Sequence, residues 1–129
     1  MIRCVHLWTD GSGNSRYAEG VLEFGPGPHG DLTTPKLPST SVSFEETKRG
    51  GSLDWHTAPA RQFVITLSGT LEFRTRGGET FVLHPGEILF AEDTAGGGHE
   101  WKLIDDDPWR RIYVVLAPGV SVPFKAEKT

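Results

Sequence analysis

The sequence is poor in cysteine: Cys4 is the one cysteine among 129 residues. A single cysteine cannot form a disulfide within the chain or build a cysteine-based zinc site. We expect Cys4 to pack as a small apolar side chain in the first strand. No apolar run approaches the ~18 residues of a membrane-spanning helix. The N-terminal residues MIRCVHLW are too short and too polar for a signal peptide, so we expect a cytoplasmic location.

Positive charge is also scarce, with 13 Lys and Arg residues against 17 Asp and Glu residues and a net charge of −4. The basic residues are scattered, so nucleic acids and anionic membranes are not expected partners. The sequence contains no glycine-rich phosphate loop, no GxSxG nucleophile motif and no Cys–His pair. The acidic run Asp105–Asp107 lacks the alternating ligand spacing of a calcium loop, so we expect a solvated turn.

Helical stripes of useful length are missing, whereas 16 glycines and 9 prolines separate short segments rich in Val, Ile, Phe, Thr and Trp. Short, evenly spaced strands with turn residues between them indicate an all-β sandwich or barrel. The predicted strands are Ile2–Trp8, Arg16–Phe24, Ser41–Glu46, Ser52–Thr57, Arg61–Ser68, Thr70–Thr75, Thr80–Leu83, Glu87–Ala91, His99–Ile104 and Arg110–Ala117. The proline-rich segment Gly25–Thr40 is expected to be a long loop along the barrel surface or over one end. The length predicts a single domain over residues 1–129.

Two motifs stand in the middle of the chain. Gly50 lies six residues before His56, Gln62 lies six residues after it, and Gly69 follows seven residues later. A second segment, LHPGEILFAEDTAGGGH, ends at His99. Together they resemble the two motifs of the cupin superfamily, whose first motif holds a His-x-His pair and a glutamate between two glycines. The resemblance implies a single-domain, double-stranded β-helix (a jelly-roll barrel) with a small-molecule site at the barrel mouth.

The family's metal ligands would fall at His56, Ala58, Gln62 and His99, so this chain departs from the pattern at two of the four positions. Two imidazoles and a neutral amide make a weaker ligand set for a transition metal than three imidazoles and a carboxylate. A divalent metal (Fe, Mn, Zn or Ni) bound by His56, Gln62 and His99 stays open, as does a metal-free pocket. Glu92 or Asp93, on the loop before His99, are the candidates for a missing carboxylate.

The leading hypothesis is a small cupin enzyme in which His56 and His99 transfer protons or bind a metal. Histidine suits proton transfer because its ordinary pKa lies near neutral pH. Gln62, Trp101 and Asp93 are the candidate substrate-binding residues, on grounds of strand parity and loop position. Isomerisation, cyclisation, elimination and metal-assisted oxygenation all remain open. The alternative is a non-catalytic module that binds or senses a small molecule in the same pocket.

Strand parity also predicts which side chains face away from the pocket. Trp55 and Arg61 alternate with the candidate site residues and should point elsewhere. His6, His29 and His84 are expected to be solvent or packing histidines.

The strand Arg61–Ser68 should turn Gln62, Val64 and Thr66 inward and Phe63, Ile65 and Leu67 outward. Soluble monomers avoid large apolar patches, so the outward residues need a cover. The N-terminal strands or the Gly25–Thr40 loop could provide it, and a second copy of the chain in a homodimer is the expected one.

Overall fold

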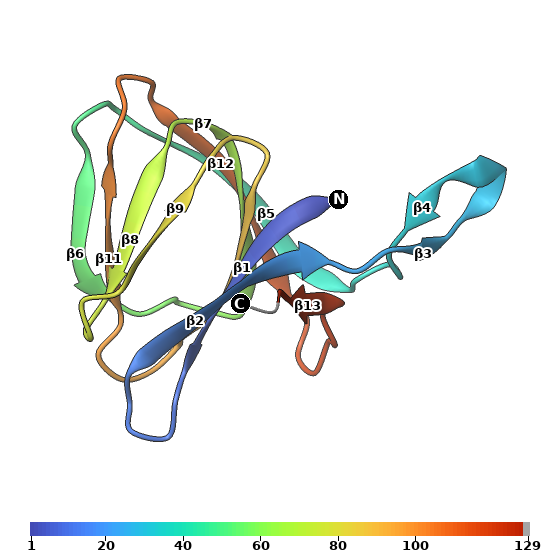
Figure 1. The fold of residues 1–129 in the computed structure, drawn as a ribbon, viewed down its shortest axis with the longest axis horizontal. Helices are drawn as coiled ribbons and strands as arrows, with labels where there is room; N and C mark the ends of the chain where they lie inside the picture. Colours follow the sequence, from blue (N-terminus) through green and yellow to red (C-terminus); the bar gives the residue numbers. More distant parts are fainter. Residues whose placement is uncertain (128–129) are drawn as a thin grey trace.

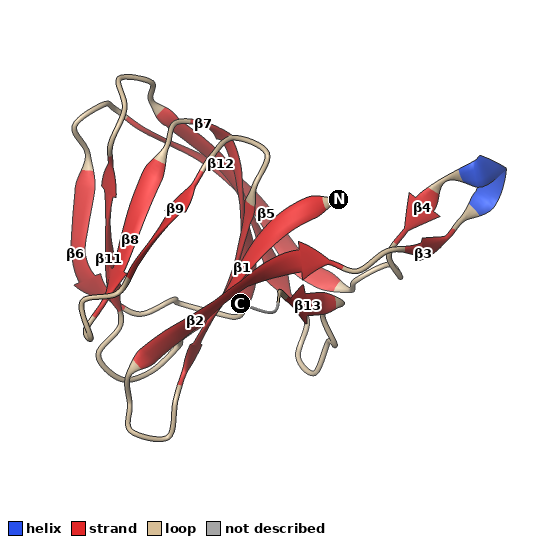
Figure 2. Ribbon diagram, in the orientation of Figure 1, coloured by secondary structure: helices blue, strands red, loops and turns tan. Residues whose placement is uncertain are grey.

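Residues 1–127 are described by the computed structural model, and they are almost entirely β-structure (Figures 1 and 2). The strands are β1 (Ile2–Thr9), β2 (Ser15–Leu22), β3 (Gly25–Pro26), β4 (Leu32–Thr33), β5 (Ser39–Thr47), β6 (Ser52–His56), β7 (Gln62–Ser68), β8 (Leu71–Thr75), β9 (Thr80–Leu83), β10 (Ile88–Glu92), β11 (His99–Leu103), β12 (Trp109–Leu116) and β13 (Phe124–Ala126). The helical part of these residues is a single 3₁₀ turn, η1 (Pro28–Gly30), and no helix among them could cross a membrane. The all-β prediction is confirmed.

The strands form two main sheets that face each other. The larger sheet has the order β13-β2-β1-β10-β7-β12-β5, and the smaller has the order β6-β11-β8-β9. Pairing is antiparallel except between β1 and β10, which run parallel. Figure 1 shows the smaller sheet standing across from β7, β12 and β5, so the space between the sheets becomes the interior of a barrel.

Hydrophobic side chains fill the barrel at one end and cover it on the outside. The inner cluster joins β1 and all the strands from β7 to β12, and its largest fully buried side chains include Leu7, Phe73 and Trp109. A second cluster lies on the outer face of the large sheet and contains Cys4 and Phe63. Burial raises the pKa of the Cys4 thiol to about 12, so this cysteine is an unreactive packing residue, as its sequence position predicts.

The segment between β2 and β5 differs from the prediction. Residues 25–33 form a short hairpin, β3 and β4 with η1 at its tip, that projects away from the barrel and lies over neither its surface nor its end (Figure 1). From this segment, Leu37 packs on the outer cluster, together with Val120, Val122 and Phe124 of the C-terminal segment. The C-terminal strand β13, which pairs with β2, was not predicted.

Candidate functional site

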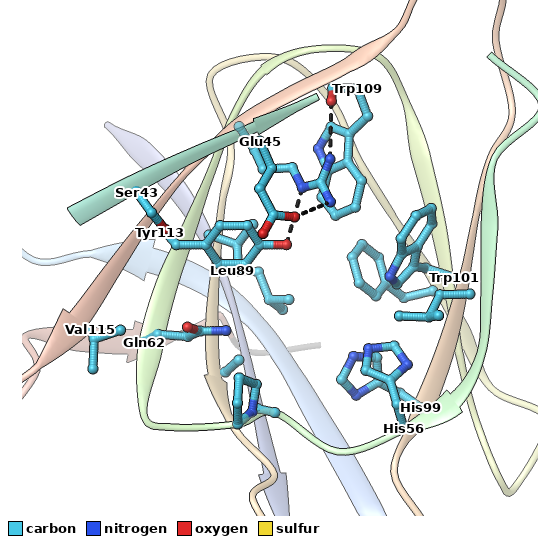
Figure 3. A pocket seen from close by; sticks show the side chains of 17 residues that line it. Ser43, Glu45, His56, Gln62, Leu89, His99, Trp101, Trp109, Tyr113 and Val115 are labelled. Atoms are coloured by element: carbon cyan, nitrogen blue, oxygen red, sulfur yellow. Dashed lines mark hydrogen bonds and ion pairs between the residues drawn. The ribbon is translucent and has the colours of Figure 1, made fainter. Parts of the chain in front are cut away.

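A pocket of about 340 Å³ lies between the two sheets (Figure 3). This volume falls in the range of small-molecule sites. Its walls come from both sheets, with side chains from β5, β7, β10 and β12 facing side chains from β6, β8 and β11. Alternation along the strands explains the selection, since Gln62 and Val64 point inward while Phe63 packs on the outer cluster.

His56 and His99 sit directly opposite each other on paired strands. They are register partners in the antiparallel pair β6–β11, and their ring centroids lie 4.4 Å apart. The register shifts between His99 and Trp101, because Trp101 pairs with Leu53 instead of Asp54. This bulge lets Leu53 and His56, three residues apart, both line the pocket.

Gly98 explains how the chain reaches His99. Its φ is +72°, and a Cβ built on it would lie 2.1 Å from the carbonyl oxygen of His56. A side chain at this position would collide with backbone, so glycine is required for β11 to begin beside the end of β6. Gly98 therefore allows His99 to lie opposite His56.

His99 is held from behind by a buried carboxylate. Asp93 is fully buried, and its Oδ2 accepts a 2.5 Å hydrogen bond from His99 Nδ1 and a 2.6 Å hydrogen bond from Ser15 Oγ. Its other oxygen, Oδ1, is buried without a hydrogen-bond partner in the described residues. The carboxylate fixes the His99 proton on Nδ1, orients the ring and balances a positive charge on it.

His56 is oriented by its own strand. Its Nδ1 donates a 2.8 Å hydrogen bond to the carbonyl oxygen of Asp54, which places the proton of the neutral ring on Nδ1 and leaves Nε2 as the free lone pair. Burial is the largest effect and lowers the pKa of His56; the hydrogen bond to the Asp54 carbonyl raises it by less, the His99 ring lowers it further, and Asp93 raises it slightly. His56 is therefore a neutral base at neutral pH.

The structure brings most of the predicted site residues together. His56, Gln62, His99 and Trp101 all line the same pocket. Gln62 stands on the opposite wall from the two histidines (Figure 3). Asp93 is not part of the lining: it lies behind His99 and contacts that ring, so the expectation of a direct substrate contact needs correction.

Glu92 lies elsewhere. Its carboxylate is held on the outer face of the large sheet by His6 Nε2 and Arg61 Nε, each at 2.5 Å. Glu92 therefore cannot complete a ligand set around His56 and His99.

The donor set of the pocket fits a resident transition metal poorly. Near the histidines it offers two imidazoles and no carboxylate, because Oδ2 of Asp93 is engaged by His99 and Ser15. Residues 1–127 contain no group of three His, Cys, Asp or Glu side chains arranged to hold a metal ion. An amide such as Gln62 does not supply the charge that Fe, Mn, Zn or Ni sites ordinarily contain.

Sequence reasoning missed the other end of the pocket, which is polar. Arg111 and Tyr113 of β12 and Glu45 of β5 line it. The available signal was alternation in the strand sequence WRRIYVVL, which puts Arg111 and Tyr113 on the same face as Trp109. What was not visible in the sequence was the pairing of β12 with β5, which sets Arg111 opposite Glu45.

The remaining predicted residues lie outside the pocket. Trp55 faces away from it and stacks under Arg76, whose guanidinium carbon is 4.1 Å from the ring centroid. His6 packs on Phe90, with ring centroids 4.6 Å apart. His29 is exposed in η1, and His84 is exposed at a turn.

The sequence pattern of a known family covers this site. The model of the cupin domain family matches residues 43–115, which run from within β5 to within β12 and include every residue that lines the pocket, together with Asp93. The chain belongs to the cupin family. Two predictions from the sequence are thereby confirmed: membership of the cupin family and a double-stranded β-helix fold. A comparison with curated proteins found no match.

Solved structures of similar shape include other cupins. A conserved protein from Klebsiella pneumoniae with a double-stranded β-helix domain is 23% identical, with a TM-score of 0.48 and coverage of 67% of this chain and 74% of that chain. A cupin-2 protein from Shewanella frigidimarina is 20% identical (TM-score 0.45, coverage 65% and 80%). NovW, a 4-keto-6-deoxy sugar epimerase from Streptomyces spheroides, is 17% identical (TM-score 0.43, coverage 90% and 71%). At this similarity the epimerase activity belongs to that protein alone.

Proposed function

We propose that this cupin is an enzyme that moves a proton on a small organic molecule, as an isomerase, cyclase or lyase does. The observation that carries the proposal is the chain of contacts from buried Asp93 through His99 to His56 at the wall of a pocket. Both histidines have Nδ1 occupied by a protein acceptor. Their Nε2 atoms are therefore the positions that act on a bound molecule.

The two rings suit opposite roles. Two positive charges at a centroid distance of 4.4 Å repel each other, so one ring of the pair becomes positively charged more readily than both. That proton belongs on His99, where the Asp93 carboxylate balances it. His56 is then the neutral base, and His99 is the acid.

The proposed step is balanced within this pair. His56 Nε2 takes a proton from a carbon next to a carbonyl group, and the electron pair of the broken C–H bond moves onto the carbonyl oxygen. His99 Nε2–H gives its proton to that oxygen, and an enol forms. Return of a proton to a different carbon completes an isomerisation, whereas loss of a leaving group completes an elimination.

The test uses phenylacetone, a neutral ketone with exchangeable protons next to its carbonyl group. Exchange of these protons in D₂O is followed by proton NMR, with free imidazole at equal concentration as the reference. We expect the wild-type protein to exceed imidazole and His99→Gln to lose at least ~100-fold. His29→Asn is the matched control, because it removes an exposed histidine and asparagine accepts the left-handed backbone found there.

Exchange no faster than imidazole, or equal exchange in wild type and His99→Gln, would count against catalysis and favour a binding or sensor module.

A weak divalent metal site on His56 and His99 is the second chemistry to be tested. Two imidazoles can bind such an ion loosely, with Gln62 across the pocket. We expect titration with Zn²⁺ or Ni²⁺ to give at most weak binding that is lost in His56→Ala, because Glu45, which supplies the carboxylate of the described lining, lies at the other end of the pocket (Figure 3). Tight, stoichiometric binding in the wild type would restore the metal mechanism.

A further inference from the structure

Arg111 is a buried cation at the end of the pocket away from the histidines. Its side chain is only 5% exposed. The guanidinium carbon lies 3.8 Å from the centroid of the Trp109 ring and 5.5 Å from that of Tyr113. Figure 3 shows Glu45 and Trp109 at this end and His56 and His99 at the other. A cation withdrawn from water among aromatic rings needs an anion or full hydrogen bonding.

The protein satisfies Arg111 incompletely. A guanidinium has five N–H donors. Nε bonds the Tyr113 hydroxyl at 3.1 Å, one terminal nitrogen bonds Thr47 Oγ1 and the Trp109 carbonyl, and the other bonds Glu45 Oε2 at 3.0 Å. These bonds use four donors, so one N–H on the nitrogen that meets Glu45 is left. The Tyr113 hydroxyl accepts from Arg111 and keeps its own hydrogen for a further acceptor.

Glu45 is a replaceable partner. Its side chain is 58% exposed, and it lies on β5, the edge strand of the large sheet. An ion pair with one partner in water contributes little, because solvent screens it and a long side chain must be held in place. In the lining, Arg111 and Glu45 are the two side chains with a permanent charge. When Glu45 turns toward solvent, the Arg111 guanidinium is left without its carboxylate partner at this end of the pocket.

We propose that Arg111 binds the carboxylate of an anionic substrate, which displaces Glu45 and takes a hydrogen bond from Tyr113 as well. The substrate class is a small carboxylic acid with an apolar or aromatic body that packs against Trp101 and Trp109 at the pocket wall, and whose reacting carbon lies toward His56 and His99. The orientation of the reacting carbon rests on the proposed function, whereas the carboxylate site rests on Arg111 alone.

The experiment compares benzoate with its neutral analogue benzamide. Dissociation constants are measured from the fluorescence of the tryptophans that line the pocket and by calorimetry. The variants are Glu45→Gln and Arg111→Gln. The chain supplies matched controls in Glu46→Gln and Arg110→Gln, because Glu46 and Arg110 form the neighbouring cross-strand pair on the outer face, at 3.2 Å.

Benzoate is expected to bind the wild type more tightly than benzamide. Glu45→Gln should tighten benzoate about threefold by removing the competing carboxylate. Arg111→Gln should weaken benzoate at least ~10-fold, while benzamide changes less than about twofold. The two controls should leave both compounds unchanged.

Several results would overturn the proposal: equal binding of the two compounds, no saturable benzoate binding by wild type or Glu45→Gln, or a folded Arg111→Gln protein with wild-type benzoate affinity. If Arg111→Gln does not fold, Glu45→Gln decides, and unchanged or weaker benzoate binding in that variant overturns it. His99→Gln should bind benzoate normally while losing phenylacetone exchange, so failure of the catalytic proposal is distinguishable from failure of the carboxylate site.

Discussion

At the scale of single residues, the site contains one atom in an energetically unfavourable environment, an oxygen of the Asp93 carboxylate. Within residues 1–127, Oδ1 of Asp93 is buried without a hydrogen-bond partner, and such an atom costs about 1–3 kcal/mol of stability. The carboxylate therefore contributes something other than stability, and its 2.5 Å contact with His99 indicates what it contributes.

The variant Asp93→Asn distinguishes an electrostatic and positioning role of Asp93 toward His99 from a role in packing alone. The amide keeps the shape and can accept the bonds from Ser15 and His99 through its oxygen, so we expect the melting temperature to change little. It cannot balance the charge on His99, so phenylacetone exchange should fall at least ~100-fold in kcat with KM nearly unchanged. Ser15→Ala, which removes the other hydrogen bond to Oδ2, is the companion variant and should cost less than ~10-fold. A variant Asp93→Asn with wild-type kcat would show that Asp93 is purely structural.

The loss of proton exchange at acidic pH should follow the protonation of His56. Its pKa is lowered from the ordinary 6.5, so the ring is neutral and active at pH 7 and is lost as a base only below pH 6.5. The exchange rate should therefore be flat near neutral pH and fall at more acidic pH. NMR titration of the His56 ring checks the same midpoint. In His99→Gln the midpoint should move up, because a positive neighbour that lowers it is gone; a His56 midpoint at or above 6.5 in the wild type contradicts this assignment.

At the scale of elements, the pairing of β6 with β11 makes the site. His56 and His99 are opposite one another because β11 starts at His99, and Gly98 lets it start there. The sequence motifs were enough to predict this convergence. The bulge that turns Leu53 and His56 to the same side was not predictable, because it follows from the register of the two strands and not from either strand alone.

Gly98→Ala should damage this arrangement. The new Cβ would meet the His56 backbone at 2.1 Å in a left-handed conformation, so either the strands separate or the loop moves. We expect a loss of at least ~1–2 kcal/mol in the free energy of unfolding, measured with urea, and slower proton exchange. Gly77→Ala is the control, because a Cβ at this turn position would meet only Glu79 Oε1, at an ordinary contact distance of 3.9 Å. Equal stability of the two variants would mean that the approach at Gly98 is looser than described.

Other elements show where sequence reasoning ends. Every predicted strand is present, and Thr80–Leu83 has the predicted bounds, because alternation and turn residues are local signals. Strand β13 has three residues, and its pairing with β2 is purely tertiary. Asp93 and His99 lie six residues apart across a glycine loop, and Arg111 meets Glu45 only through the β12–β5 register. Contacts of this kind depend on the path of the chain and on register, which local patterns do not contain.

At the scale of the whole molecule, the outer face of the large sheet divides into a covered and an open part. Phe63 is buried under the chain's own C-terminal segment and Leu37, so a second copy is not needed to cover it. Leu67 remains 54% exposed, Phe44 is 71% exposed and Val42 is 55% exposed. The last two lie on the edge strand β5, where open backbone hydrogen-bonding groups also favour association.

We therefore propose a homodimer with a two-fold axis near Val42, Phe44 and Leu67. Phe44→Glu should convert it to a monomer, because a charge in the middle of the apolar patch cannot be buried without a partner. Sedimentation at micromolar concentration measures the change. Ile104→Glu, at an exposed apolar residue beside the small sheet, should stay dimeric. A monomeric wild-type protein, or a dimer that persists in Phe44→Glu, would contradict this interface.

The most direct test of the account is the position of the protons on the two rings. Two-bond ¹H–¹⁵N NMR of the histidine rings distinguishes neutral Nδ1–H, neutral Nε2–H and doubly protonated imidazole. Above the midpoint of His56, that ring should be neutral with its proton on Nδ1, whereas His99 should carry protons on both Nδ1 and Nε2, with an Nδ1 signal that shifts in Asp93→Asn. A His56 ring with its proton on Nε2, a neutral His99 ring, or a His99 signal that does not respond to Asp93→Asn would contradict the proton-transfer site.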